Sequence, residues 1–135
     1  MEVQKYSEWL VSVPDYLKRD ALWDLDIYRK SVFLYELAWV DCELLLKHPL
    51  GKPIAHQLIR SAGSIAANME EGYGRGFGKD YARFLRIALG SARESRGWYH
   101  RSRKVLKAGV IEHRIKQLDT IIAGLIRLSK QQALR

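Results

Sequence analysis

Apolar side chains return every three or four positions along four long stretches of this chain. Residues 27–45 show the pattern most densely, and residues 54–69 repeat it. The same spacing runs through residues 79–107 and 110–131. This is the period of an α-helix with one buried face, whereas a half-buried strand would alternate strictly. The pattern therefore predicts four helices, over residues 26–47, 54–71, 79–107 and 110–131.

Short breaks separate the four predicted helices. Prolines and glycines mark these breaks, at Pro49, Gly51, Pro53, Gly72, Gly74, Gly76, Gly78 and Gly109. A glycine costs about 1 kcal/mol in a helix interior relative to alanine, so the four glycines between positions 72 and 78 require a turn. Short connections favour sequential neighbours that run in opposite directions. We therefore predict an all-α fold, an antiparallel up-down-up-down four-helix bundle over residues 25–135.

The N-terminal extension, residues 1–24, has a small apolar pattern of its own. Four residues share helical spacing ahead of a proline: Tyr6, Trp9, Leu10 and Val13. This spacing predicts a short helix that packs on the bundle or on a neighbouring subunit.

The first predicted helix of the bundle carries a second apolar stripe beside its main buried face. The stripe consists of Phe33, Leu37, Val40 and Leu44. A surface helix normally has one apolar stripe, with polar residues on the other side. Either the N-terminal extension or another subunit must therefore cover this second stripe.

Composition narrows the class of protein. The chain has 135 residues, of which 47% are hydrophobic, and this is enough for one domain with a substantial core. Its single cysteine, Cys42, rules out an internal disulfide and suits a reducing compartment. The first 20 residues contain acids and a proline, unlike a signal peptide. Charged residues interrupt each apolar stretch before it reaches membrane-spanning length. We expect a cytoplasmic protein with no membrane contact.

Positive charge is concentrated in the second half of the chain. Lysines and arginines number 23 against 15 acidic residues, which gives a net charge of +8. The first 50 residues nevertheless carry nine acidic and six basic side chains, whereas residues 101–135 carry two acidic and nine basic ones. A basic surface attracts polyanions. We therefore expect nucleic acid as a partner of the second half.

Eight of these cations fall on one side of the third predicted helix. The cations there are Arg83, Arg86, Arg93, Arg96, Arg101, Arg103, Lys104 and Lys107. Glu94 is the only acid among them, so these like charges repel, whereas an ordinary solvated face forms i,i+4 pairs of opposite sign. The planar donor fork of arginine suits phosphate oxygens. We interpret the face as a nucleic-acid surface, with a solvated face that only improves solubility as the alternative.

The other side of the third helix is predicted to be buried. It would carry Phe84, Ile87, Ala88, Ser91, Trp98, Ser102 and Val105. Leu85 and Leu89 then lie at the edge of the basic face, where they would be exposed. Exposed apolar residues on two helices favour self-association. The predicted oligomer interface comprises Phe33, Leu37, Val40, Leu44, Leu85 and Leu89.

The glycine-rich turn extends the basic surface with Arg75 and Lys79. Tyr73 and Phe77 lie in the same segment. Their rings could stack on an unpaired base, as aromatic side chains do in proteins that bind single-stranded RNA. Alternatively, the two rings close the end of the bundle. The sequence leaves both interpretations open.

No arrangement of side chains predicts catalysis. The four histidines have no histidine at i+3 or i+4, and Cys42 has no cysteine or histidine nearby in sequence, so we expect no metal site. The adjacent acids Glu70 and Glu71 point about 100° apart on a helix and do not form a carboxylate pair. We expect a non-enzymatic protein without cofactors.

Several short motifs resemble one known family. They are Ser64-Ile65, Asn68, Glu71-Gly72-Tyr73-Gly74-Arg75, Arg83-Phe84-Leu85 and Ala88-Leu89-Gly90-Ser91. From about Leu25 onward the chain resembles the small bacterial four-helix-bundle proteins first noted as products of intervening sequences inside large-subunit ribosomal RNA genes. The N-terminal extension has no counterpart in the usual family member. Ser95 and Gly97 stand where apolar or helix-favouring residues are expected.

The resemblance implies a fold and partners but no catalytic residues. It implies a homopentamer in which the bundles form a ring, and contact with nucleic acid, with RNA favoured over DNA. Relatives that assist the reverse transcriptases of diversity-generating retroelements look like the same bundle. The alternative function is therefore an adaptor that docks a reverse transcriptase and its RNA.

Overall fold

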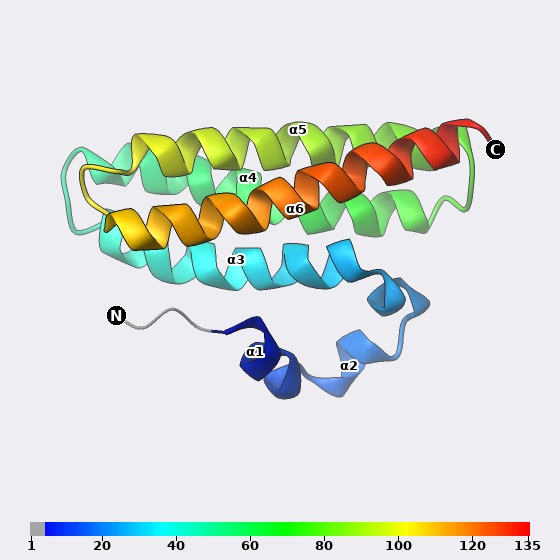
Figure 1. The fold of residues 1–135 in the computed structure, drawn as a ribbon, viewed down its shortest axis with the longest axis horizontal. Coiled ribbons are helices and arrows are strands. Elements are labelled where there is room, and N and C mark those ends of the chain that lie inside the picture. Colours follow the sequence, from blue (N-terminus) through cyan, green and yellow to red (C-terminus); the bar gives the residue numbers. More distant parts are fainter. Residues whose placement is uncertain (1–4) are drawn as a thin grey trace.

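The computed structural model describes residues 5–135, and every regular element in that range is helical (Figure 1). The elements are α1 (Tyr6–Ser12), α2 (Asp15–Lys18), the 3-10 helix η1 (Ala21–Asp24), α3 (Asp26–Leu45), α4 (Gly51–Tyr73), α5 (Lys79–Arg101) and α6 (Ala108–Ala133). The predicted all-α class is confirmed. The first four residues of the predicted N-terminal extension lie outside the described residues.

The four long helices, α3 to α6, form a helical bundle. They lie side by side, and successive helices reverse direction along the colour gradient of Figure 1. α4 contacts α3 and α5, and α6 contacts α5 and α3. Their shared core contains completely buried side chains from every long helix, including Leu34, Leu58, Leu85 and Leu125. Burying one such side chain contributes about 1.5–3 kcal/mol, so this core holds the helices together.

Small residues let α4 and α5 approach closely. Ala62 on α4 and Ala92 on α5 are completely buried, as close helix packing requires. The hydroxyls of Ser61 and Ser95 lie 2.8 Å apart in this interface. The Ser95 hydroxyl also donates to the carbonyl oxygen of Ser91 at 2.9 Å. Ser95 departs from the apolar residue that the family pattern leads one to expect, and these hydrogen bonds satisfy its buried hydroxyl.

The glycine-rich segment turns the chain between α4 and α5, as predicted. Gly76 and Gly78 have a φ of +90°, a conformation that glycine adopts more readily than any residue with a Cβ atom. A Cβ atom at Gly72 would lie 2.7 Å from Cβ of Phe84, so this glycine permits close contact between α4 and α5. The Gly78 N–H donates to Oε1 of Gln132 at 3.0 Å. This bond ties the turn to the C-terminal end of α6.

α5 ends at Arg101, and the prediction that it continues to Lys107 is wrong. The amides of Val105 and Leu106 donate to the carbonyl oxygen of Ser102, and Leu106 is buried. Residues 102–107 therefore form a compact turn that a buried leucine closes. This segment contains no glycine or proline, so nothing in the sequence indicated that the helix ends here. The cations Arg103, Lys104 and Lys107 lie in this turn and do not share the helical face of α5.

The buried face of α5 differs in part from the predicted one. Phe84, Ala88 and Ser102 are buried as predicted, but Ile87 is 43% exposed. Leu85 and Tyr99 are completely buried, although the prediction placed neither in the core. The packed side of α5 combines small residues with large ones: Ala82, Ala88, Ala92 and Ser95 with Tyr81, Phe84, Leu85 and Tyr99. The prediction, which relied on hydrophobicity alone, therefore assigned the wrong rotation of α5 about its axis.

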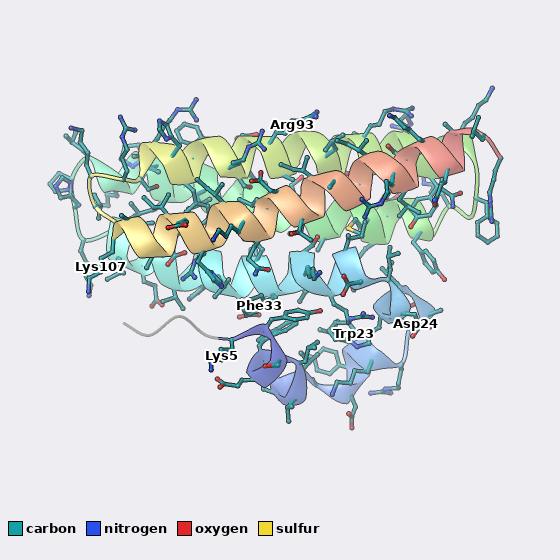
Figure 2. The ribbon with its side chains drawn as sticks, in the orientation of Figure 1. Lys5, Trp23, Asp24, Phe33, Arg93 and Lys107 are labelled. Carbon is teal, nitrogen blue, oxygen red and sulfur yellow. The ribbon has the colours of Figure 1, made fainter. Side chains whose placement is uncertain are left out.

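The N-terminal segment covers half of the second apolar stripe of α3. Phe33 and Leu37 form a small cluster with Trp9 and Val13, separate from the main core. Figure 2 shows Phe33 on the side of α3 that faces α1. The other two stripe residues, Val40 and Leu44, remain 38% and 37% exposed. The N-terminal extension, and not another subunit, therefore covers Phe33 and Leu37, the first half of the stripe.

Candidate nucleic-acid interface

Three exposed cations form a row along α5. Lys79, Arg86 and Arg93 are seven residues apart, which on an α-helix places neighbours about 10.5 Å from each other on nearly the same side. Figure 2 shows Arg93 at the outer edge of α5. Within residues 5–135, none of the three has a carboxylate within ion-pair distance. We call these three residues the α5 ladder.

A hollow of about 350 Å³ opens between α5 and α6 beside the ladder. Arg86 and Arg93 line it from α5, and Lys130 lines it from α6. Lys130 is exposed and also has no ion pair in the described part of the chain. Leu89 and Ile126 supply apolar lining. Three uncompensated cations around one hollow create a site of high positive potential, to which phosphate oxygens are well matched.

Other predicted cations already have partners. Arg96 bonds Asp119 at 2.8 Å, Arg83 bonds Asp80 at 3.3 Å, and Arg75 bonds Glu71 at 3.0 Å. These pairs are exposed, so each contributes little to stability and can exchange partners. They nevertheless compensate the charge locally. The predicted basic face therefore divides into compensated and uncompensated cations.

The remaining predicted cations lie at the far end of α5. Arg101 stacks on the ring of Trp98, with 4.7 Å between its Cζ atom and the ring centroid. Arg103 donates from Nη1 to the carbonyl oxygen of His100 at 3.0 Å. Lys104 and Lys107 are exposed in the α5–α6 turn, which lies at the end of the bundle opposite the glycine-rich turn (Figure 2). These four residues form a second basic region rather than a continuation of the ladder.

The aromatic residues of the glycine-rich turn have different surroundings. Phe77 is 71% exposed beneath the guanidinium of Arg135, so it does not close the end of the bundle. Tyr73 packs edge-on against Tyr81, with ring centroids 6.1 Å apart. Phe77 is therefore the more exposed of the two rings, at 71% against 37% for Tyr73, and its one recorded ring contact is with Arg135.

The matched family is described as 23S rRNA-intervening sequence protein, and the match covers residues 24–128. The chain belongs to this family. The predicted family is confirmed, and the match begins at residue 24, close to Leu25, where the resemblance was predicted to begin. α1 and α2 precede the matched residues.

A solved structure supports the fold of this family member. It is the 1.70 Å crystal structure of a protein with unknown function from the S23 ribosomal protein family of Bacteroides thetaiotaomicron VPI-5482. It shares 23% sequence identity with this chain, covers 77% of this chain and 98% of its own, and superposes with a TM-score of 0.72. No curated protein matches the chain. Among the helices of residues 5–135, none combines the length and apolarity needed to cross a membrane.

The predicted oligomer interface is divided in this family member. Phe33 and Leu37 lie beneath the N-terminal segment, and Leu85 is completely buried in the bundle core. These three side chains cannot touch another subunit while this packing holds. Val40 and Leu44 are exposed, and Leu89 lines the hollow between α5 and α6. Of the six predicted interface residues, only these last three offer apolar surface for self-association.

The bundle also holds a buried polar cluster that the sequence pattern did not reveal. Nε and Nη2 of Arg114 on α6 bond Oδ2 and Oδ1 of Asp41 on α3 at 2.8 and 3.1 Å. The Tyr99 hydroxyl donates to Oδ2 of Asp41 at 2.6 Å. Burial, and next the charge of Asp41, raise the pKa of Tyr99 well above its ordinary value, so the hydroxyl remains a donor. In the sequence, the only sign of this cluster is one acid, Asp41, among the apolar residues of α3.

This buried cluster is unsuited to catalysis. Asp41 and Tyr99 are completely buried and Arg114 is 2% exposed, so no substrate can reach them. Each member is hydrogen-bonded to another, which is the condition for keeping charges inside a protein. We interpret the cluster as a structural contact that fixes α3, α5 and α6 relative to one another.

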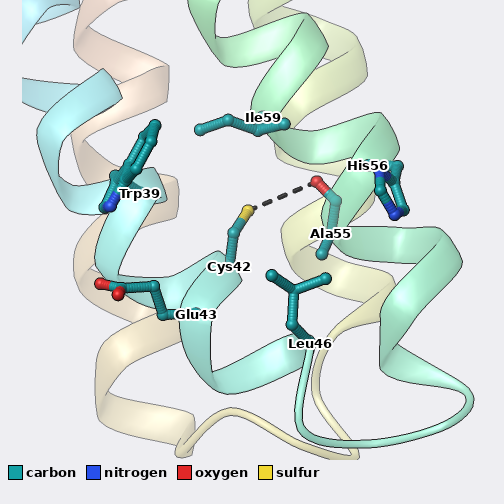
Figure 3. Close-up of a pocket in the computed structure, with 7 residues that line it drawn as sticks. All are labelled: Trp39, Cys42, Glu43, Leu46, Ala55, His56 and Ile59. Atoms are coloured by element: carbon teal, nitrogen blue, oxygen red, sulfur yellow. Dashed lines mark hydrogen bonds between the residues drawn. The ribbon is translucent and has the colours of Figure 1, made fainter.

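A small apolar cavity of about 220 Å³ lies between α3 and α4 near their connection (Figure 3). Cys42 lies inside it, and its thiol donates to the carbonyl oxygen of Ala55 at 3.4 Å. Burial, followed by the charge of Asp41, raises the pKa of Cys42 to about 12, so the thiol is protonated at neutral pH. Glu43 and His56 lie on opposite sides of the cavity in Figure 3. Cys42 is therefore a small buried apolar residue, as predicted, and not a nucleophile.

Proposed function

We propose that this protein is a non-enzymatic, antiparallel four-helix bundle that binds structured RNA through the α5 ladder and the hollow beside it. One observation carries the proposal: Arg86, Arg93 and Lys130 surround one hollow, Lys79 lies farther along the same side of α5, and all four are exposed without any carboxylate partner in residues 5–135. The family name refers to sequences that interrupt 23S ribosomal RNA. This supports RNA over DNA as the partner.

The physical argument rests on uncompensated charge. Like charges on one helix face repel and weaken the fold slightly, so a purely structural surface gains nothing from them. A polyanion supplies the missing negative charge and releases its counterions, which favours binding. Arginine forks bind phosphate oxygens in two-pronged fashion. The ladder therefore suits the backbone and shape of an RNA, and the exposed ring of Phe77 can add a stacking contact.

Self-association would strengthen this binding. Val40, Leu44 and Trp39 expose apolar surface on α3, and such surface is commonly covered by another subunit. We place a second copy there, within the five-subunit ring that the family resemblance implies. A ring would repeat the ladder around one axis, and several ladders on one RNA raise affinity without new kinds of contact.

The test compares two triple variants with the same net charge. Arg86→Gln/Arg93→Gln/Lys130→Gln removes uncompensated cations, whereas Arg75→Gln/Arg83→Gln/Arg96→Gln removes cations that already have carboxylate partners. RNA affinity of each is measured across a salt series with a structured RNA, after circular dichroism has confirmed helicity. Each neutralised phosphate contributes about 0.7–0.9 to the slope of log K against log salt.

We expect Arg86→Gln/Arg93→Gln/Lys130→Gln to lose most of its affinity and about two to three units of slope, and the control variant to keep both. An equal loss in the two variants would show attraction to net charge alone. If the unmodified protein does not bind RNA at low salt, the function is wrong, and the ladder is a protein interface, such as the docking site for a polymerase.

A further inference from the structure

A second cavity, of about 270 Å³, lies where the N-terminal segment meets the bundle. Tyr16 of α2 and Asp20, which precedes η1, line one side. Tyr28 of α3 and the pair Glu70 and Tyr73 at the end of α4 line the other. Tyr16 and Asp20 lie outside the part of the chain that matches the family. The N-terminal segment therefore forms one wall of this cavity.

Hydrogen bonds hold both carboxylates in place at the cavity. The Tyr28 hydroxyl donates to Oε2 of Glu70 at 2.7 Å, and the Leu22 amide donates to Oδ1 of Asp20 at 3.1 Å. Burial, the bond to Glu70 and the charge of Glu70 all raise the pKa of Tyr28, so its hydroxyl stays a donor. The second oxygen of each carboxylate accepts no hydrogen bond from residues 5–135. Each carboxylate thus keeps a free acceptor.

The negative charge at this cavity is uncompensated. Neither Asp20 nor Glu70 has an ion-pair partner among the described residues, although the next residue, Glu71, bonds Arg75 at 3.0 Å. This is unexpected in a chain with a net charge of +8. Three tyrosines share the lining, and aromatic rings attract cations through the negative charge of their faces.

We infer that this cavity binds an organic cation, a guanidinium or primary ammonium group held by Glu70 and Asp20 and flanked by the tyrosines. Carboxylates form their strongest hydrogen bonds with such charged donors. The volume fits the head group of an amine or of an arginine side chain, and is smaller than the usual site for a drug-sized ligand. The cation can come from a free small molecule or from a side chain of another protein. This site is independent of the RNA function.

The experiment titrates the full chain with two probes by isothermal titration calorimetry. Agmatine carries one guanidinium and one ammonium group and represents the free small molecule. A blocked hexapeptide with a single arginine represents the protein side chain. Glu70→Gln removes a carboxylate that lines the cavity, and Glu71→Gln removes the neighbouring carboxylate that does not. Both residues are exposed near the end of α4, so both variants should fold.

We expect binding with one site per chain, at least about tenfold weaker in Glu70→Gln and unchanged in Glu71→Gln. Tyr16→Leu keeps the apolar bulk but removes the aromatic face, and it should weaken binding several-fold. Agmatine binding supports a small-molecule ligand, and binding of the peptide alone supports a protein side chain. The inference is overturned if neither probe binds, or if Glu71→Gln weakens binding as much as Glu70→Gln.

Discussion

Arg93 and Arg114 belong to the same bundle, yet their surroundings are opposite. Arg93 is exposed on α5 and has no carboxylate partner in the described chain, whereas Arg114 is buried and forms two bonds with Asp41. Removing a guanidinium from water costs several kcal/mol unless a well-placed partner compensates it. An exposed guanidinium carries no such requirement. Arg114 therefore serves folding, whereas Arg93 has no partner in the described chain and is available for the RNA contact proposed above.

The largest expected effect comes from breaking the buried pair. Asp41→Asn leaves Arg114 charged and without a carboxylate, which should lower the free energy of unfolding by about 3–5 kcal/mol. Arg93→Gln, by contrast, should change it by less than about 0.5 kcal/mol. Urea unfolding followed by circular dichroism measures both. Near-equal effects of the two substitutions would refute the distinction between the two arginines.

An apolar replacement of the whole buried cluster sharpens the same point. Asp41→Leu/Arg114→Met/Tyr99→Phe removes both charges and the hydroxyl together, so none of the three buried residues keeps an unsatisfied polar group, and His113, which loses its contact with Arg114, is only partly buried. Such replacements are often neutral or stabilising, so the triple variant should recover most of the stability that Asp41→Asn loses. If it remains as unstable as the single variant, packing and not charge explains the loss.

The next effect concerns the hydroxyl that completes the cluster. Tyr99→Phe removes the 2.6 Å donor to Asp41 and leaves a small void, with an expected loss of about 1.5–3 kcal/mol because the acceptor is charged. Tyr28→Phe is a matched control, since its hydroxyl bonds the exposed Glu70, which water can solvate instead. We expect the control to lose less than half as much in the same urea assay.

The sequence predicts elements better than it predicts partners. The amphipathic helices, the glycine-rich turn and the basic second half all follow from local patterns, and the structure has them. The pair of Asp41 and Arg114 could not be predicted. In the sequence, Asp41 only interrupts the apolar pattern of its helix, and its partner can be identified only when the residues of the facing helix are known. Likewise, the sequence could not show that Asp119 on α6 compensates Arg96. Both facts depend on how helices are rotated about their axes, and small residues on α5 concealed that rotation.

A smaller effect is the salt dependence of stability, which should differ between the exposed cations around the hollow and the buried pair. Repulsion among Arg86, Arg93 and Lys130 is exposed to solvent, so added salt screens it. The free energy of unfolding of the unmodified protein should therefore rise by a few tenths of a kcal/mol from low to moderate salt. In Arg86→Gln/Arg93→Gln/Lys130→Gln this rise should disappear, with stability at low salt equal to or slightly above that of the parent. A less stable variant would mean that these three cations have a structural role.

The smallest effect is a change in the pH dependence of stability caused by His113, which lies beside Arg114. Nδ1 of His113 lies 2.8 Å from Nη1 of Arg114, and burial, followed by the charge of Arg114, lowers the pKa of His113 although Asp41 opposes this. The unfolded chain then binds more protons than the folded one below about pH 6.5, so this histidine reduces stability as the pH falls through that range. His113→Gln should make the decline in stability between about pH 7.5 and 5.5 shallower. Identical pH slopes for variant and parent would contradict the lowering of the pKa of His113 by burial and by the charge of Arg114.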